Sequence, residues 1–431
     1  MTTFEWVIGL LLGATVLSGL ARRIRVPYAT FLAITGALLA FVPFGPSWTL
    51  EPQLALALFV APVLLDAAFD TSLRDLRHNW LPVSTLVVAA VGFTTVVVAV
   101  VAHALVPNMP WASAVALGAI VAPPDAAAAT AILRQVNLPY RMLKILEGES
   151  LLNDASSLLI YRAAVGAVAA QHLSWGEFAP QLLVALAGSL AFGYVSARVW
   201  MLIAGRVSDP PSAIILQFAS TFTVWIFAER IGLSGILTIV AYAFTISRGA
   251  PSRMSARLRV SSYAVWETVV FMLNVLAFML IGMQLRPIWS RLDAVVRWQY
   301  CEVAACVLAA VILARVVWVA IYGTTMRTLV TRGISHPQMA VPTVAGGIVM
   351  SWCGMRGIVT LASAFALPED FPYRDLILLT AFAVVLGSLV IQGLTLRPLI
   401  SALYLKADNV VAREVARARH GLSRGAYRDR W

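Results

Sequence analysis

Long apolar runs separated by short polar loops occupy almost the whole chain, and they constrain its fold more than any other feature. A helix needs about 20 apolar residues to cross the hydrocarbon core of a bilayer, where only helices and closed barrels satisfy their backbone groups. Of the 431 residues, 60% are hydrophobic and 12% are charged, a composition outside the range of soluble proteins. The sequence therefore predicts an all-α polytopic membrane protein.

Thirteen runs are long enough to serve as transmembrane helices. We expect spans near residues 4–20, 27–44, 53–69, 82–105, 112–133, 146–170, 179–203, 212–230, 232–248, 265–284, 299–322, 341–366 and 375–397. The start of the chain lacks the basic residues of a cleaved signal peptide, so the first run is retained as a span. We expect one membrane domain over residues 1–400 and a short basic tail over residues 401–431.

The basic residues predict an orientation, since short cytoplasmic loops are enriched in Lys and Arg. With thirteen spans, the tail and one set of alternate loops hold 24 of the 32 basic residues, whereas the opposite loops hold five. We therefore expect the N-terminus outside and the C-terminus in the cytoplasm. The net charge of +11 is then explained by the anionic lipid surface, and we expect no nucleic-acid partner.

We single out eight ionisable side chains inside the predicted spans, because such a side chain costs about 2.5 to 3.5 kcal/mol at a helix centre. They are Asp66, Asp125, Glu149, Asp154, Arg162, Glu267, Arg315 and Arg356. We expect Arg162, Glu267 and Arg315 near helix ends or in packing pairs. The histidines and cysteines have no metal-binding spacing, so no cofactor is expected.

Two predicted spans carry helix-breaking sequences. Pro123 and Pro124 remove two amide donors in the fifth span, so we expect a break there and a second half-helix over residues 126–133. Asp125 would lie in the first turn of that half-helix, where the helix dipole favours a carboxylate. Paired glycines at 346–347 and the segment Gly354–Gly357, around Arg356, predict a break in the twelfth span. These two spans run in opposite directions, which indicates inverted repeats with a transport site at two crossing discontinuous helices.

The segment from Glu147 to Asp154 offers two polar faces on one helix. Ser150 and Asp154 share one face, and Glu149 and Asn153 share the next. Carboxylate, hydroxyl and carbonyl oxygens suit alkali cations better than transition metals. One face can therefore bind a cation, while the other can present Glu149 to a structural partner such as Arg356.

Motifs in six segments, taken together and in this order, resemble one known family. They are Val63–Ala68, Ala122–Leu133, Leu146–Asp154, Leu233–Leu237, Phe278–Leu285 and Cys353–Thr360. The chain from about residue 5 to 400 resembles the bacterial sodium/proton exchangers of the monovalent cation:proton antiporter family. The resemblance implies thirteen helices, two inverted repeats and a homodimer in the bacterial inner membrane. It also implies a transport domain, drawn from the helices within about 53–170 and 265–397, that moves against a dimerisation domain. The physiological role that the resemblance implies for the protein is pH homeostasis.

The resemblance also implies roles for individual residues. Asp154 and Asp125 would bind the cation or a proton, and Ser150, Asp66, Asn153 and the Pro124 carbonyl would complete the Na⁺ and proton site. Glu149 and Arg356 would form a structural ion pair. The pair Asn153–Asp154 resembles the asparagine-aspartate form, which implies electroneutral one-for-one exchange.

Two positions depart from the family pattern. The residue before Asp125 is proline where many members carry threonine, and position 66 is Asp where relatives often carry Glu, so Na⁺, K⁺ and Li⁺ all stay open as substrates. A K⁺/H⁺ antiporter of the same fold is the main alternative. The sequence has neither the filter-like segment expected of a cation channel nor the signature of an intramembrane aspartyl protease. We therefore expect a transporter rather than an enzyme.

Overall fold

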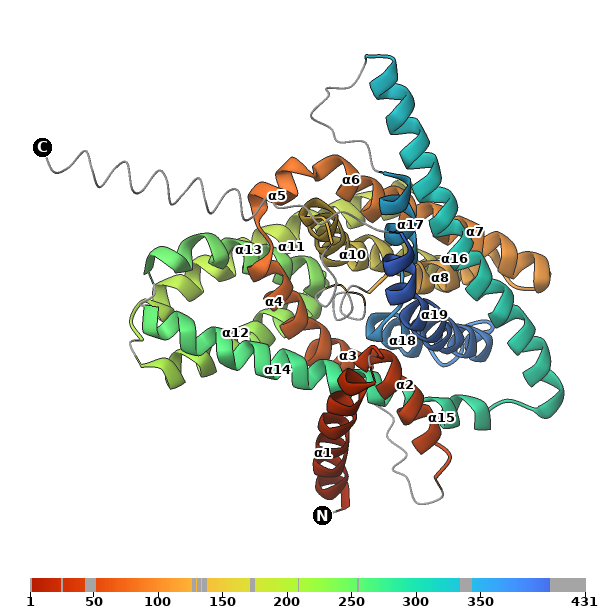
Figure 1. Ribbon diagram of the computed structural model, residues 1–431, viewed down its shortest axis with the longest axis horizontal. Coiled ribbons are helices and arrows are strands. Elements are labelled where there is room, and N and C mark those ends of the chain that lie inside the picture. Colours follow the sequence, from red (N-terminus) through yellow and green to blue (C-terminus); the bar gives the residue numbers. More distant parts are fainter. Residues whose placement is uncertain are drawn as a thin grey trace, which may run out of the picture.

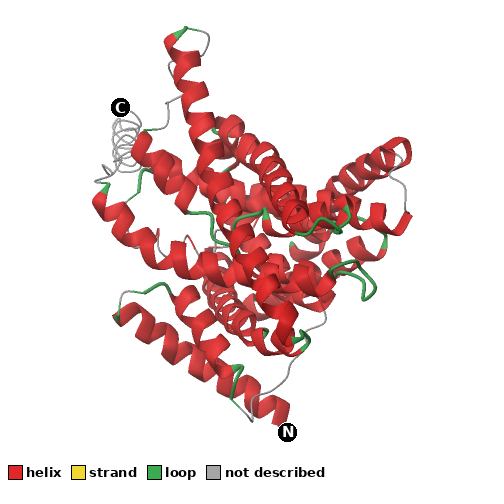
Figure 2. Ribbon diagram, turned by 90° about the vertical axis from the view of Figure 1, so that its right-hand side faces the viewer, coloured by secondary structure: helices red, strands yellow, loops and turns green. Residues whose placement is uncertain are grey.

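The chain forms an all-helical bundle in a computed structural model. The structure describes residues 2–403 except 25, 43–51, 126–128, 130–132, 134–137, 171–174, 208, 254–255 and 334–342. Among the described residues there are helices and connecting loops but no strand (Figure 2). The predicted all-α class is therefore confirmed.

The helices are of two kinds, long rods and shorter segments that follow one another within a span. The long helices are α1 (Thr2–Arg23), α10 (Tyr140–Ala170), α11 (Trp175–Ala204), α12 (Pro210–Arg230), α13 (Gly235–Arg253), α14 (Ala256–Met283), α16 (Ala294–Thr331) and α19 (Arg374–Ala402). The shorter elements are α2 (Tyr28–Leu39), α3 (Pro52–Ala55), η1 (Leu56–Val60), α4 (Ala61–Asp70), α5 (Leu73–His78), α6 (Trp80–Ser84), η2 (Thr85–Ala90), α7 (Val91–Leu105), α8 (Trp111–Val121), α15 (Leu285–Ser290), α17 (Val344–Trp352) and α18 (Ile358–Phe365).

Every predicted span contains at least one of these helices, although the second half of the fifth span lies almost entirely outside the described residues. Helix boundaries differ where a helix continues past its apolar run, as in α16, which has 38 residues. Within the described residues, six helices are long and apolar enough to cross a membrane by themselves. The number of thirteen crossings stays a prediction.

Two of the spans contain a wider, π-helical stretch. In the third span, η1 leads into α4, whose first turn contains Pro62. Proline has no N–H, so the regular hydrogen-bond register cannot pass through this point. In the fourth span, the Val87 carbonyl within η2 accepts a hydrogen bond from the Ser156 hydroxyl at 2.5 Å. This bond ties the fourth span to α10, the helix that carries the predicted site.

Small residues allow α2 and α14 to cross with their backbones in contact. A side chain at Gly36 would overlap the Met279 carbonyl, and a side chain at Gly282 would overlap the Ala33 carbonyl. Such close approach is a common way for helices to associate where the surroundings are as apolar as the side chains.

The helices with the predicted ion-binding residues lie in the middle of the molecule. In Figure 1, α8, α10, α17, α18 and α19 lie between α11 to α13 on one side and α7 with α16 on the other. α10 packs against α8, η2, α4 and α13, and α19 packs against α8, α16, α17 and α18. Both predicted helix breaks therefore fall in the centre of the fold.

Candidate ion-binding site

The first predicted break is present at the double proline. α8 ends at Val121, and Ala122 to Asp125 are not helical. The second half-helix expected over residues 126–133 lies almost entirely outside the described residues. The structure does show which groups hydrogen-bond to the free backbone carbonyls at the end of α8.

The end of α8 has carbonyl groups that its own backbone cannot satisfy. The Ala119 carbonyl would pair with residue 123, but that residue is proline, and the Ser157 hydroxyl of α10 donates to it instead at 2.7 Å. The guanidinium of Arg356 donates to the next free carbonyls, from Nε to Val121 at 3.0 Å and from Nη2 to Ala122 at 3.2 Å. Arg356 thus brings a positive charge to the negative end of the α8 dipole.

The second break lies between α17 and α18, over residues 353–357. The prediction of a break in this span is confirmed, but Gly346 and Gly347 are helical and do not take part in it. In this segment the Arg356 N–H donates to the Ser388 hydroxyl of α19 at 3.0 Å, and its guanidinium also donates to the Gly354 carbonyl. Arg315 of α16 donates from Nε to the Met350 carbonyl near the end of α17 at 3.2 Å. Each broken helix therefore has an arginine at its carbonyl end.

The two unwound segments meet directly, which confirms the predicted crossing. The Asp125 N–H donates to the Met355 carbonyl at 2.6 Å. The carboxylate of Asp125 occupies the space that a side chain at residue 357 would need, so only glycine fits at Gly357. The position of Asp125 is therefore set by the segment between α17 and α18 as well as by its own segment after α8.

α10 brings the other predicted ligands to this crossing. The amide of Asn153 donates from Nδ2 to the Pro124 carbonyl at 2.6 Å, while its buried Oδ1 has no hydrogen-bond partner among the described residues. Asp154 follows directly and is partly buried, and the charge of Asp125 is close enough to act on it. The structure therefore brings together two carboxylates, an amide oxygen and the Pro124 carbonyl.

Two further predicted ligands lie on elements that reach this region. Ser150 is partly buried one turn before Asp154 on α10. Asp66 is also partly buried and lies on α4, which packs against α10. Both side chains have interactions of their own. Their role as ligands stays a prediction.

The predicted ion pair between Glu149 and Arg356 is wrong. Glu149 instead forms a two-pronged salt bridge with Arg315, from Nη1 to Oε1 at 2.5 Å and from Nη2 to Oε2 at 2.9 Å. The side chains of Glu149 and Arg315 are only 2% and 4% exposed. The guanidinium of Arg356 donates its hydrogen bonds to backbone carbonyls, because the two helix breaks place those carbonyls around it.

The remaining intramembrane charges lie apart from this cluster. Arg162 of α10 pairs with Glu229 of α12 at 2.9 Å, and both side chains are more than a third exposed. Glu267 is exposed on α14. Arg162 therefore lies in a packing pair, as expected. Arg315 also lies in a packing pair, as expected, but its partner is Glu149, the acid that the sequence had assigned to Arg356.

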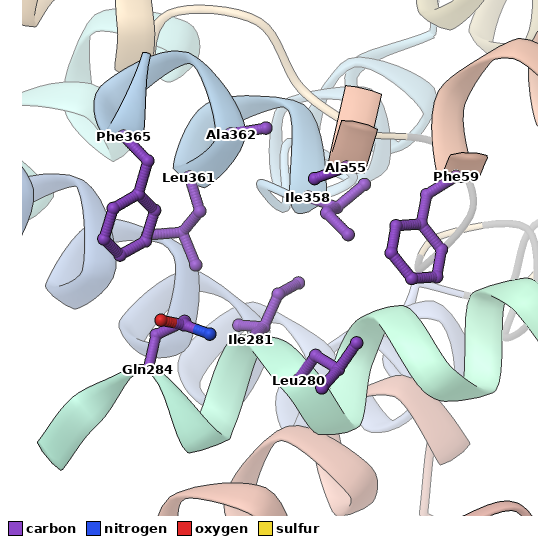
Figure 3. Close-up of a pocket in the computed structure, with 9 residues that line it drawn as sticks. All are labelled: Ala55, Phe59, Leu280, Ile281, Gln284, Ile358, Leu361, Ala362 and Phe365. Carbon is purple, nitrogen blue, oxygen red and sulfur yellow. The ribbon is translucent and has the colours of Figure 1, made fainter. Parts of the chain in front are cut away.

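An apolar pocket lies beside α18, which begins right after Gly357 (Figure 3). Its lining residues come from α3, η1, α14, the position between α14 and α15, and α18, and are Ala55, Phe59, Leu280, Ile281, Gln284, Ile358, Leu361, Ala362 and Phe365. The amide of Gln284 is the one polar side chain in this lining, and the pocket has a volume of about 40 Å³. That volume holds a few water molecules at most, so the pocket is too small and too apolar to carry a hydrated cation.

An all-helical membrane protein with two crossing, interrupted helices and paired carboxylates at the crossing belongs to the class of secondary transporters. The sequence profile of the family described as "Sodium/hydrogen exchanger, transmembrane" matches residues 8–402. The chain belongs to this family of transporters, as its motifs led us to expect.

Named relatives agree with this assignment. The chain is 30% identical over 394 residues to the "Sodium, potassium, lithium and rubidium/H(+) antiporter" of Bacillus pumilus, with 88% of this chain and 57% of the relative covered. It is 26% identical over 425 residues to the "Na(+)/H(+) antiporter NhaS2" of Synechocystis, with 96% and 73% covered. The chain thus spans little more than half of the Bacillus pumilus protein.

A solved structure has the same fold. The sodium proton antiporter MjNhaP1 from Methanocaldococcus jannaschii matches with a TM-score of 0.71 at 15% identity, covering 94% of this chain and 99% of that one. At this identity, the likeness supports the fold alone.

Proposed function

We propose that the protein exchanges a monovalent cation, Na⁺ first, for H⁺ by alternating access at Asp154 and Asp125. The observation that carries this proposal is the meeting of the two carboxylates at the crossing, where the Asp125 N–H is held by the Met355 carbonyl. Oxygen ligands suit a hard alkali cation better than sulfur or imidazole ligands do. Membership of the exchanger family supports the same reaction.

Coupling follows from competition for the same oxygens. A carboxylate that has bound a proton has lost the charge that attracts a cation, so Asp154 carries either Na⁺ or H⁺ across and needs no separate proton pathway. Because residue 153 is Asn and not Asp, the site has one carboxylate fewer to titrate than a site with two adjacent aspartates. One Na⁺ then exchanges for one H⁺ with no net charge moved.

Alternating access requires a site that opens to one side of the membrane at a time. The pocket beside α18 is too small for a hydrated ion, so a path through it would open only if α18 moved relative to α14. The helices drawn from about 53–170 and 265–397 would supply the moving transport domain, against a dimerisation domain of the remaining helices in a homodimer.

K⁺ is the second candidate substrate. The printed name of the Bacillus pumilus relative includes potassium, lithium and rubidium as well as sodium. Two features of this chain bear on the choice, namely proline at 124 and the shorter acid Asp66. We place the protein in the bacterial inner membrane, with the N-terminus outside and the C-terminal tail in the cytoplasm, where it would serve pH homeostasis.

The test is cation-driven proton movement in proteoliposomes that contain the purified full chain and a pH-sensitive dye. A Na⁺ gradient should drive saturable proton movement in the opposite direction, and Asp154→Asn should abolish it. Asp209→Asn is the matched control, because Asp209 is an exposed N-cap of α12 that asparagine can replace. Hydrogen bonds from Ser212 lower the pKa of Asp209, so it is charged in the assay.

Three results would contradict the proposal. Full activity of Asp154→Asn would remove the assigned site. A membrane potential generated by transport itself would exclude electroneutral exchange. Cation flux that does not saturate and does not move protons would favour a channel. Repeating the assay with K⁺ and Li⁺ gradients decides the substrate.

A further inference from the structure

Three arginines from two distant parts of the chain surround one hollow at the surface. The hollow has a volume of about 490 Å³ and is lined by Leu73, Arg74 and Arg77 of α5 and by Arg248 of α13. All three arginines are exposed. None of them takes part in the ion-binding site, so the function proposed above leaves this cluster unexplained.

The docking of α5 on α10 fixes the direction of its arginines. The Asp75 carboxylate accepts a hydrogen bond from the Tyr140 hydroxyl at 2.8 Å, and Leu76 packs against Gly148 of α10. Residues 74 and 77 are three apart and lie on the opposite side of this short helix. The contact with α10 therefore holds the arginines of α5 out toward the hollow.

Two of the three arginines, Arg77 and Arg248, keep their charge available to a ligand. Across the described part of the chain, no carboxylate forms a salt bridge with Arg77 or Arg248, and Asp75 of the same helix is turned toward Tyr140. Guanidinium groups match the geometry of phosphate oxygens and can donate two hydrogen bonds to one group. The hollow therefore has the chemistry of a phosphate-binding site.

The position of the hollow points to a lipid as the source of that phosphate. It lies where the loop after the third span meets the end of α13, on the side that the distribution of basic residues assigns to the cytoplasm. Trp80, just after α5, is 61% exposed, as expected for an aromatic anchor at a membrane interface. Basic pockets between spans on this side are suited to anionic lipid headgroups.

We propose that this hollow binds the phosphate-bearing headgroup of an anionic phospholipid of the cytoplasmic leaflet. A lipid held between Arg77 and Arg248 joins α5, which is docked on α10, to α13. It thereby adds a lipid-mediated link between α10, the helix of Asp154, and α13, which also packs against α10 directly.

The test is lipid binding to the purified full chain in detergent, measured by native mass spectrometry with phosphatidylglycerol and with phosphatidylcholine. We expect tighter binding of phosphatidylglycerol, with about a fivefold loss in Arg77→Gln or Arg248→Gln and about a 25-fold loss in the double variant. Arg332→Gln removes an exposed arginine at the end of α16 that does not line the hollow, and it should bind as the unmodified protein does.

Each other outcome would overturn the proposal. Unchanged phosphatidylglycerol binding in the double variant excludes this site, and equal binding of phosphatidylcholine excludes selection of an anionic lipid. Displacement of phosphatidylglycerol by inorganic phosphate at equal concentration would make the hollow a site for soluble anions. If the double variant is not folded, as judged by its thermal midpoint without lipid, phosphatidylglycerol binding by the two single variants is compared with that of the unmodified protein instead. Unchanged binding in both single variants then excludes this site.

Discussion

The buried salt bridge between Glu149 and Arg315 gives the sharpest prediction about stability. Arg315→Met would leave the Glu149 carboxylate buried without a partner, a change that costs about 3 to 5 kcal/mol. It would also remove the donor to the Met350 carbonyl, at about 1 to 3 kcal/mol. Changing both Glu149 and Arg315 to methionine removes the buried charge together with its partner. We therefore expect the double variant to be more stable than either single variant.

The measurement is the free energy of unfolding of each variant in mixed detergent micelles, with increasing SDS as the denaturant. A double-mutant cycle over Glu149 and Arg315 should give a coupling energy of about 3 kcal/mol. A second cycle over Glu149 and Arg356 should give less than about 1 kcal/mol, since Arg356 donates to carbonyls and not to this acid.

The two cycles also define what would refute the reasoning. Additive effects of the changes at 149 and 315 would mean that the salt bridge is absent from the protein in solution. A larger coupling between 149 and 356 than between 149 and 315 would restore the pairing that the sequence suggested.

Three further predictions concern the crossing itself. Ser157→Ala should lower the free energy of unfolding by about 1 to 3 kcal/mol, because the Ala119 carbonyl loses its donor and Pro123 has no N–H to replace it. A change below about 0.5 kcal/mol would argue against this role of Ser157. Gly357→Ala should abolish transport in vesicles, because the added methyl group overlaps the Asp125 carboxylate. Gly323→Ala is the control and should keep transport activity, because a methyl group there meets no neighbouring atom. Equal activity of the two variants would contradict the crossing geometry. On the acid side, the apparent KM for Na⁺ should rise about tenfold for each pH unit as protons compete for the carboxylates, and a KM independent of pH would contradict shared binding.

Most of the fold could be predicted because the membrane imposes a simple rule on the sequence. Apolar runs of sufficient length had to be helices, and each predicted span contains at least one helix among the described residues. Pro123 and Pro124 located the first break, since proline cannot donate a backbone hydrogen bond. The glycines at 346 and 347 misled the prediction of the second break, because glycine permits unwinding but does not require it.

The contacts within the site were less predictable. Sequence shows which charged residues lie inside the membrane, but not which of two arginines meets a given acid. Arg315 and Arg356 are chemically alike, and the choice depends on where two helix ends leave their carbonyls, which only the packed structure reveals. The contact between Asp125 and Gly357 joins the two repeats across more than half of the chain, and no local pattern indicates it.

The central claim is that one carboxylate site holds either a proton or a cation. It is tested most directly by measuring, with purified protein in weakly buffered detergent solution, the number of protons released as Na⁺ binds. The account predicts about one proton released for each Na⁺ bound at a pH where exchange is half-maximal, and no release from Asp154→Asn. Saturable Na⁺ binding without proton release, or equal release from Asp154→Asn, would contradict it.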